Sequence, residues 1–236
     1  MQSFESQKKY YWILRRLVAM ILKLFTKIQV VGLDHINLRG PAILVCNHRS
    51  DIDPSVITSV IPRYICWIAA NYMKQVPMTG WIIKKTGMIL MDVQGKVSPS
   101  SYKRALEILD RNEILGIFPE GENYIFNNDF SAPLVSFHPG FGIIALKKKA
   151  PIIPVMICPL KEKLKRIHIP NSIRKEIGKV HDLEKIKHMV RYKNVKVIIG
   201  EPINIETMYA GDMKLTVSKV VQKTREVMLK IQKEFE

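Results

Sequence analysis

The chain has 236 residues and a formal net charge of +16, a length that suffices for one domain with a substantial core and an appendage. Its three cysteines, at positions 46, 66 and 158, show no Cys-x-x-Cys spacing, so neither a disulfide framework nor a zinc site is indicated. The segment from Lys147 to Lys196 holds 15 Lys and Arg residues against four acidic ones, a net +11, which indicates an anionic partner. Nucleic acid is disfavoured as that partner, because the basic segment has no binding-motif signature and no interleaved aromatic residues.

An amphipathic helix is predicted at the N-terminus. One helical face carries apolar side chains and the other carries basic ones: Ile13, Leu17, Met20, Ile21, Leu24 and Ile28 against Lys9, Arg16, Lys23 and Lys27. The uninterrupted apolar stretch between Arg16 and Lys23 is far shorter than the ~20 residues that span a bilayer. A basic amphipathic helix of this kind is typical of one that lies in the headgroup plane, although it could instead dock on the protein's own sheet. We therefore divide the chain into an interfacial helix, residues 1–28, and a main domain, residues 29–236.

The main domain alternates predicted strands with predicted helices. The strands are expected at Gln29–Gly32, Ala42–Cys46, Tyr64–Ala69, Met88–Met91, Ile114–Phe118, Ile152–Ile157 and Val195–Ile199, and the helices at Pro54–Ile61, Asn71–Thr86, Pro99–Arg111, Gly140–Lys149, Leu183–Arg191 and Met213–Lys233. This alternation predicts an α/β fold with a mostly parallel central sheet covered by helices on both sides. The aromatic-rich stretch Asn123–Pro139 is expected to be a lid or a wall for an acyl chain, or else a plain surface loop.

Polar residues follow the strand Ala42–Cys46 directly. Asn47 and His48 come first, and Asp53 lies five residues after His48, just before Pro54. This order places an imidazole at the mouth of the sheet with a carboxylate near enough to orient it, and such a His can take a proton from a hydroxyl at neutral pH. A plainer alternative is that Asp53 is the N-cap of the helix that begins at Pro54 and that His48 is an incidental surface residue.

A second apolar strand also ends in a polar turn, formed by Pro119, Glu120 and Gly121. Ligands of open α/β sheets bind outside the carboxyl ends of the strands, which is where both turns would lie. Gly121 allows the backbone to approach a ligand closely. Glu120 could contact a substrate hydroxyl, orient the turn, or only accept local backbone N–H groups. The proline-bearing segment Pro151–Ile157, taken alone, predicts an edge strand.

In this order and spacing, the segments resemble the glycerolipid acyltransferase family, whose best-known members acylate lysophosphatidate or glycerol 3-phosphate. The family's Asn-His-x4-Asp block is matched by Asn47–Asp53 and its Phe-Pro-Glu-Gly block by Phe118–Gly121. Its later proline-bearing strand is matched by Pro151–Ile157. The resemblance spans roughly Val30–Ile205, and several ordered blocks make it far more specific than one motif.

The resemblance implies transfer of a fatty acyl group to a lysophospholipid hydroxyl, most simply that of 1-acyl-glycerol-3-phosphate. The co-substrate would be acyl-CoA or acyl carrier protein, with no metal and no other cofactor. His48 would act as general base oriented by Asp53, while Asn47, Glu120 and Gly121 would contribute to substrate binding. The other expected partner is a membrane surface with anionic lipids. The protein would then be peripheral or monotopic on the cytoplasmic face of the cell membrane.

Two positions depart from the family's pattern. Val93 and Asn123 stand where the family often has arginines that are expected to hold an acceptor phosphate. Lys84, Lys85 and Lys96 could replace them as point charges, or could belong to an ordinary solvated face. The departures leave two other hypotheses open: the same chemistry on another lipid or glycolipid acceptor, or a non-catalytic membrane-binding protein with this fold.

Overall fold

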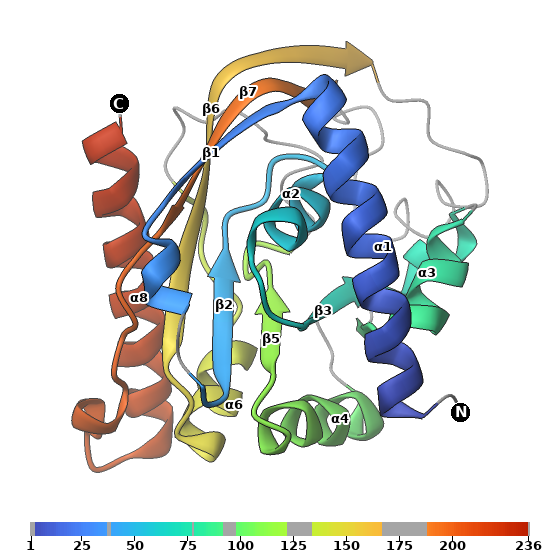
Figure 1. Cartoon of the computed structure of the whole chain (residues 1–236). Coiled ribbons are helices and arrows are strands. Elements are labelled where there is room, and N and C mark those ends of the chain that lie inside the picture. Colours follow the sequence, from blue (N-terminus) through green and yellow to red (C-terminus); the bar gives the residue numbers. More distant parts are fainter. Residues whose placement is uncertain are drawn as a thin grey trace.

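A mixed, mostly parallel sheet forms the centre of the protein (Figure 1). The structure is a computed structural model that describes residues 3–36, 39–76, 78–91, 98–121, 134–166 and 188–235. Within these residues the strand order is β1-β7-β6-β2-β5-β3-β4, and every neighbouring pair is parallel except β6 and β7. The strands are β1 (Lys27–Val31), β2 (Ala42–Cys46), β3 (Ile65–Ala70), β4 (Ile89–Met91), β5 (Ile114–Ile117), β6 (Ile152–Arg166) and β7 (His188–Ile199). The predicted α/β fold is confirmed.

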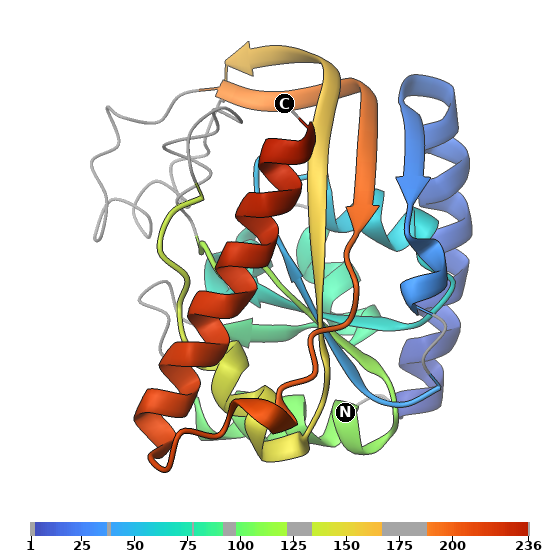
Figure 2. The same ribbon diagram turned by 90° about the vertical axis from the view of Figure 1, so that its left-hand side faces the viewer.

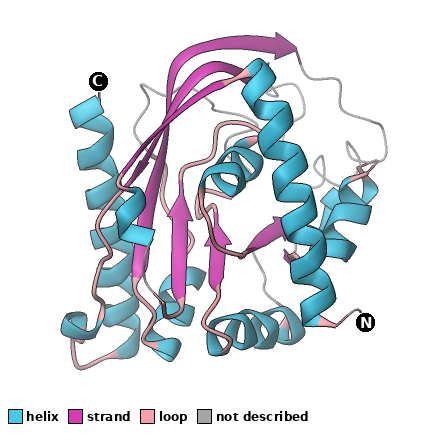
Figure 3. Cartoon of the chain, in the orientation of Figure 1, coloured by secondary structure: helices cyan, strands magenta, loops and turns pink. Residues whose placement is uncertain are grey.

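Helices cover both sides of this sheet, as Figure 2 shows for α1 and α8. On one side α1 contacts α2 and α3, while α4, α6 and α8 form a second contiguous set (Figure 3). Their bounds are α1 (Phe4–Phe25), α2 (Asp53–Val60), α3 (Thr79–Thr86), α4 (Pro99–Asp110), α6 (Gly140–Lys148) and α8 (Met213–Phe235), with short 3₁₀ helices η1 (Leu33–Ile36), η2 (Asn71–Gln75) and η4 (Glu206–Met208). The predicted helices that correspond to α2, α4, α6 and α8 agree with these bounds to within two residues.

The strand β2 lies in the middle of the core. All five of its residues are fully buried, because β5 and β6 flank it in the sheet and helices lie over its faces. A parallel strand buried in this way needs a continuous apolar run, which is the pattern that the sequence shows. Val45 is in register with Ile117, so the turns after β2 and β5 leave the sheet side by side. The predicted meeting of these two turns at one edge is therefore observed.

The strand β6 is central, so the prediction that Pro151–Ile157 forms an edge strand is wrong. It lies between β2 and β7. Ile152 exchanges both backbone hydrogen bonds with Ile203, and the carbonyl of Pro154 accepts from the N–H of Gly200 at 2.8 Å. The β6–β7 register begins only at Val155. Proline has no backbone N–H to donate. Because Pro154 lies at the very end of that ladder, the missing donor costs few hydrogen bonds between the strands.

Two predicted helices need correction. The helix expected over Leu183–Arg191 is wrong for residues 188–191, which belong to β7, and residues 183–187 lie outside the described residues. Buried residues alternate along β7 at Val190 and Tyr192 and again at Val195, Val197 and Ile199, with the period of two interrupted once, where the register with β6 shifts. The helix expected over Asn71–Thr86 is interrupted after η2. Val76, which precedes a proline in the sequence, is extended, as that position favours.

The helix α1 is docked on the protein through one face and exposed through another. The Tyr11 hydroxyl donates to the carbonyl of Arg63 at 3.1 Å, and the Arg15 guanidinium donates to three carbonyls at the C-terminal end of α2, a favourable place for a cation. The apolar face identified in the sequence points elsewhere. Its exposed members are 44–74% accessible: Ile13, Leu17, Met20, Ile21 and Leu24, together with Phe25. α1 ends at Phe25 rather than Ile28, and no helix in the described ranges is long and apolar enough to cross a bilayer.

Gly116 in β5 is closely packed against side chains of β3. A Cβ there would lie 2.5 Å from Trp67 Cε3 and 2.8 Å from Ile65 Cγ2. We expect Gly116→Ala to lower the free energy of unfolding by about 1–3 kcal/mol in urea denaturation, since overpacking forces both neighbours to move. The matched control is Gly140→Ala, where a Cβ would meet nothing within 4 Å. Equal losses in the two variants would contradict this account.

Candidate active site

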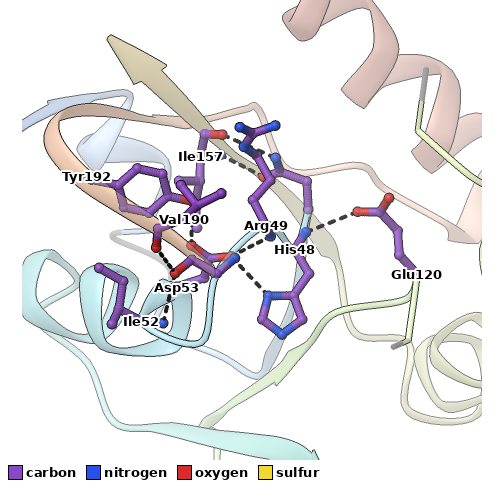
Figure 4. Close-up of polar contacts among 10 residues, drawn as sticks. His48, Arg49, Ile52, Asp53, Glu120, Ile157, Val190 and Tyr192 are labelled. Carbon is purple, nitrogen blue, oxygen red and sulfur yellow. Dashed lines mark hydrogen bonds and ion pairs between the residues drawn. The ribbon is translucent and has the colours of Figure 1, made fainter. Parts of the chain in front are cut away.

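The carboxylate of Asp53 is the centre of a hydrogen-bond network at the carboxyl end of β2 (Figure 4). It is fully buried. Its Oδ2 lies 2.9 Å from His48 Nδ1 and accepts the backbone N–H groups of Arg49 and Ser50 at 2.6 and 2.7 Å. Its Oδ1 accepts the hydroxyl of Tyr192 at 2.8 Å. Because the carboxylate is an acceptor for all these donors, we assign the Nδ1 proton to His48, which leaves Nε2 as the basic nitrogen of the ring.

The alternative that Asp53 is a helix N-cap is wrong. The N-cap of α2 is Ile52, with no side-chain capping bond, and Asp53 is already helical. Its carboxylate bonds instead to Arg49 and Ser50, which precede the helix. The side chain therefore turns back and closes the loop onto His48. Pro54 follows within the first turn, where a proline is favoured.

His48 is held by two contacts of its imidazole and one of its backbone. One edge faces Asp53, and one ring face stacks on Phe118 with centroids 4.2 Å apart. Phe118 stacks in turn on Trp67 at 5.1 Å. The backbone N–H of His48 donates to Glu120 Oε1 at 3.0 Å. The His48 side chain is still 12% exposed, so a ring held in one orientation remains accessible at the surface.

The turn after β5 brings Glu120 to His48. Gly121 has a φ of 66°, in the left-handed region that glycine adopts without strain, and its N–H donates to Phe118. Glu120 is only 8% exposed, and burial raises the pKa of its carboxyl above the ordinary range. The structure thus unites His48, Asp53, Glu120 and Gly121 in one place. The contact of Glu120 with the His48 backbone links the two turns, and the substrate contact expected of Glu120 and Gly121 stays a prediction.

The other predicted substrate contacts lie in different settings. The buried Asn47 amide binds the backbone of Ile157 through both its oxygen and its nitrogen, at 2.7 and 3.1 Å, and so ties the end of β2 to β6. Lys84 is exposed on α3, and Lys85 lies over the ring of Tyr10 with its Nζ 4.5 Å from the centroid. Lys96 lies outside the described residues. The substrate contacts proposed for Asn47 and the three lysines stay predictions.

Sequence reasoning missed the contribution of β6 and β7 to this site. We call residues 161–166 of β6 and 188–194 of β7 the β6–β7 extension; Figure 1 shows these strand ends curving over the top of the sheet. Besides Tyr192, the extension provides Glu162, whose two carboxylate oxygens accept from the Arg49 guanidinium at 2.9 and 3.0 Å. It also provides the Val190 carbonyl, which accepts the Ser50 hydroxyl at 2.6 Å. Three residues of the extension therefore hold the segment from Arg49 to Asp53.

Tyr192 remains a proton donor in this setting. Its burial and the neighbouring Asp53 carboxylate raise the pKa of its phenol well above the usual value. The signal that could have located Tyr192 is the alternation of apolar or aromatic with basic residues from Val190 to Lys193. That signal was obscured by the surrounding Lys and Arg residues, which favoured a charged helix.

Residues 27–158, more than half of the chain, match a family model described as Acyltransferase. The chain belongs to this acyltransferase family. The resemblance noted from the sequence is thereby confirmed. The matched segment holds His48, Asp53 and Glu120, whereas the β6–β7 extension lies beyond it.

Named relatives of this acyltransferase domain support the same assignment. A 1-acyl-sn-glycerol-3-phosphate acyltransferase of Helicobacter pylori is 35% identical over 119 residues, 50% of this chain and 48% of that protein. A protein of the same name from Saccharomyces cerevisiae is 26% identical over 149 residues, 62% of this chain and 48% of the relative. The chain thus spans about half the length of these relatives. The crystal structure of a Thermotoga maritima 1-acyl-sn-glycerophosphate acyltransferase matches with a TM-score of 0.60 at 18% identity, over 97% of this chain and 83% of that one, which supports the fold.

Tyr192→Phe tests the hydrogen bond between the β6–β7 extension and Asp53. The variant removes a donor from a buried carboxylate oxygen, so we expect the free energy of unfolding to fall by about 1–3 kcal/mol in urea denaturation. Tyr209→Phe is the matched control, because its hydroxyl bonds to Gly211 on the exposed surface. A loss no larger than that of the control would show that the Tyr192 hydroxyl contributes little.

Proposed function

We propose that this protein is an O-acyltransferase that moves a fatty acyl group from an acyl thioester to the hydroxyl of a lysophospholipid, most simply 1-acyl-glycerol-3-phosphate. The observation that carries the proposal is the pair formed by His48 Nδ1 and Asp53 Oδ2, 2.9 Å apart, at the carboxyl end of a central strand. The names of the Helicobacter and yeast relatives support the acceptor. The donor would be acyl-CoA or an acyl carrier protein.

The chemistry follows from the orientation of His48. Its Nε2 takes the proton of the acceptor hydroxyl while the hydroxyl oxygen attacks the thioester carbonyl carbon. The tetrahedral intermediate then collapses: the new ester C–O bond remains, the C–S bond breaks, and the imidazolium returns its proton to the departing thiolate. Asp53 stabilises the imidazolium and holds the ring in position. The step as proposed needs no metal and no cofactor besides the thioester co-substrate.

Direct transfer to the acceptor is favoured over a covalent acyl-enzyme. Cys46 is the thiol nearest to His48 in the sequence, but it is fully buried in β2. Burial, with the Asp53 carboxylate nearby, raises the pKa of this thiol well above its ordinary value. A buried thiol of that kind is a poor nucleophile.

The same proposal places the protein on a membrane surface, as a peripheral or monotopic protein of the cytoplasmic face. Its support is the exposed apolar stripe on α1, flanked by exposed Arg16 and Lys23. An apolar helix face bordered by basic residues fits the boundary between headgroups and acyl chains. Since the opposite face of α1 docks on α2, the catalytic domain would be held close to the lipid.

The activity is tested by thiol release from palmitoyl-CoA, with products identified by mass spectrometry and lysophosphatidate compared with lysolipids that lack the terminal phosphate. We expect acylation of lysophosphatidate, and a loss of about 10²–10⁴-fold in His48→Ala, the range that a general base contributes. His35→Ala is the control, since the His35 ring bonds to the Ile199 carbonyl and not to Asp53.

Each other outcome of this assay has a definite meaning. Near-normal turnover in folded His48→Ala would remove His48 from its role as base. Acylation of only the phosphate-free lipids would overturn the proposed acceptor and assign Val93 and Asn123 to a changed specificity. Silence with both palmitoyl-CoA and palmitoyl carrier protein would contradict catalysis on these acceptors.

The membrane proposal is tested on the exposed face of α1, because deletion of the whole helix would also remove its docked face. We expect Leu17→Ser combined with Leu24→Ser to weaken co-sedimentation with anionic vesicles by at least about tenfold, as two exposed leucines lose their burial in lipid. Met213→Ser with Leu215→Ser, two comparably exposed apolar residues on α8, is the matched control. Unchanged binding by the α1 variant, with native circular dichroism, would contradict the proposal.

A further inference from the structure

A groove of about 650 Å³ runs between the C-terminal half of α1, the start of α2 and the β6–β7 extension. Its walls are largely apolar and include Ile21, Phe25, Ile52 and Leu164. Its volume lies within the ~300–1,000 Å³ that is typical of small-molecule sites. The described residues that line the groove do not include His48 or Glu120, so it is separate from the catalytic face.

Three cations line the same groove. Lys163 of β6 stands directly opposite Arg191 of β7, and Lys193, at the register shift two residues further along β7, lines the same groove. All three are exposed. Like charges opposite each other destabilise an antiparallel pair. Among the described residues no carboxylate forms an ion pair with them, and Glu162 between Lys161 and Lys163 is bound by Arg49. An anionic group at this point would relieve the repulsion.

The groove is continuous with the apolar stripe of α1. Ile21 and Phe25 belong to both, and they are 44% and 65% exposed. Leu164, on the opposite wall, is 59% exposed. Large apolar side chains exposed together mark a contact surface for lipid or protein, and the adjacent basic residues fit the negative surface of a lipid leaflet.

We propose that this groove binds one anionic phospholipid from the membrane, with an acyl chain against Ile21, Ile52 and Leu164 and the phosphate beside Lys163, Arg191 and Lys193. A free phosphate would leave the apolar walls uncovered, and a neutral lipid would leave the three cations without a partner. The inference rests on the membrane association proposed above. It adds a second lipid position, behind the loop that carries the catalytic pair: Tyr192 lines the groove while its hydroxyl binds Asp53.

The site is tested with the full chain bound to phosphatidylcholine vesicles that contain phosphatidylglycerol with a diazirine on one acyl chain. After irradiation, the labelled residues are located by proteolysis and mass spectrometry. We expect labels at Ile52 and Leu164 as well as along α1. Labels confined to Ile13, Leu17 and Met20 would overturn the groove and leave membrane association standing. A protein that neither sediments with the vesicles nor becomes labelled would overturn both.

Charge variants identify the headgroup contact. Reversal of the three groove cations, Lys163→Glu with Arg191→Glu and Lys193→Glu, should lower labelling at Ile52 and Leu164 by at least about fivefold. The matched control, Lys214→Glu with Lys219→Glu and Lys223→Glu, changes the net charge equally on exposed positions of α8 and should retain the labels. Lys163→Gln alone, with native circular dichroism, gives a smaller loss of the same kind if the triple variant does not fold. Equal labelling by a phosphatidylcholine probe, or displacement by lysophosphatidate but not by phosphatidylglycerol, would overturn the proposed ligand.

Discussion

The buried carboxylate of Asp53 is the constraint around which the catalytic end of this protein is arranged. A charge removed from water is tolerated only when hydrogen bonds replace its hydration. Asp53 obtains them from the loop that precedes it, from His48 and from Tyr192, which is 139 residues away in the sequence. The need to satisfy one carboxylate thus joins the N-terminal half of the domain to the last strand of the sheet. The same bonds that solvate Asp53 also orient the imidazole.

The sheet supplies the second part of that orientation. Because β2 and β5 are parallel neighbours in register, Phe118 leaves β5 beside the residues that follow β2. Its ring is held between His48 and Trp67, and Trp67 packs over Gly116, where a larger residue would displace it. A glycine in the middle of a central strand weakens the strand itself. Here it makes room for an aromatic stack that ends at the imidazole, so strand packing and the position of His48 depend on each other.

The meeting of His48, Asp53 and Glu120 could be predicted from the sequence because the information is local. Two apolar runs each end in polar residues, and parallel neighbours bring such ends to one edge. Tyr192 could not be found in this way, because its role depends on which strand lies antiparallel to β6. The position of β6 could not be predicted for the same reason. A proline predicts an edge strand, yet Pro154 lies just outside the β6–β7 ladder that it would interrupt. The direction of the α1 apolar stripe was equally undetermined, since both docking and exposure satisfy an amphipathic pattern.

The two faces of the β6–β7 extension carry different kinds of residues. Glu162 and Tyr192 face each other across the pair and bind the loop that holds the catalytic residues. Lys163 and Arg191, one residue along in each strand, face each other on the opposite side. Since successive side chains of a strand alternate between faces, basic residues on one face are compatible with loop-binding residues on the other. A one-residue slip of β7 would move its side chains to the other face of the pair and would turn Tyr192 away from Asp53. The register of this pair, which has β-bulges near Lys161, therefore determines both the hydrogen bonds of Asp53 and the position of the surface charge.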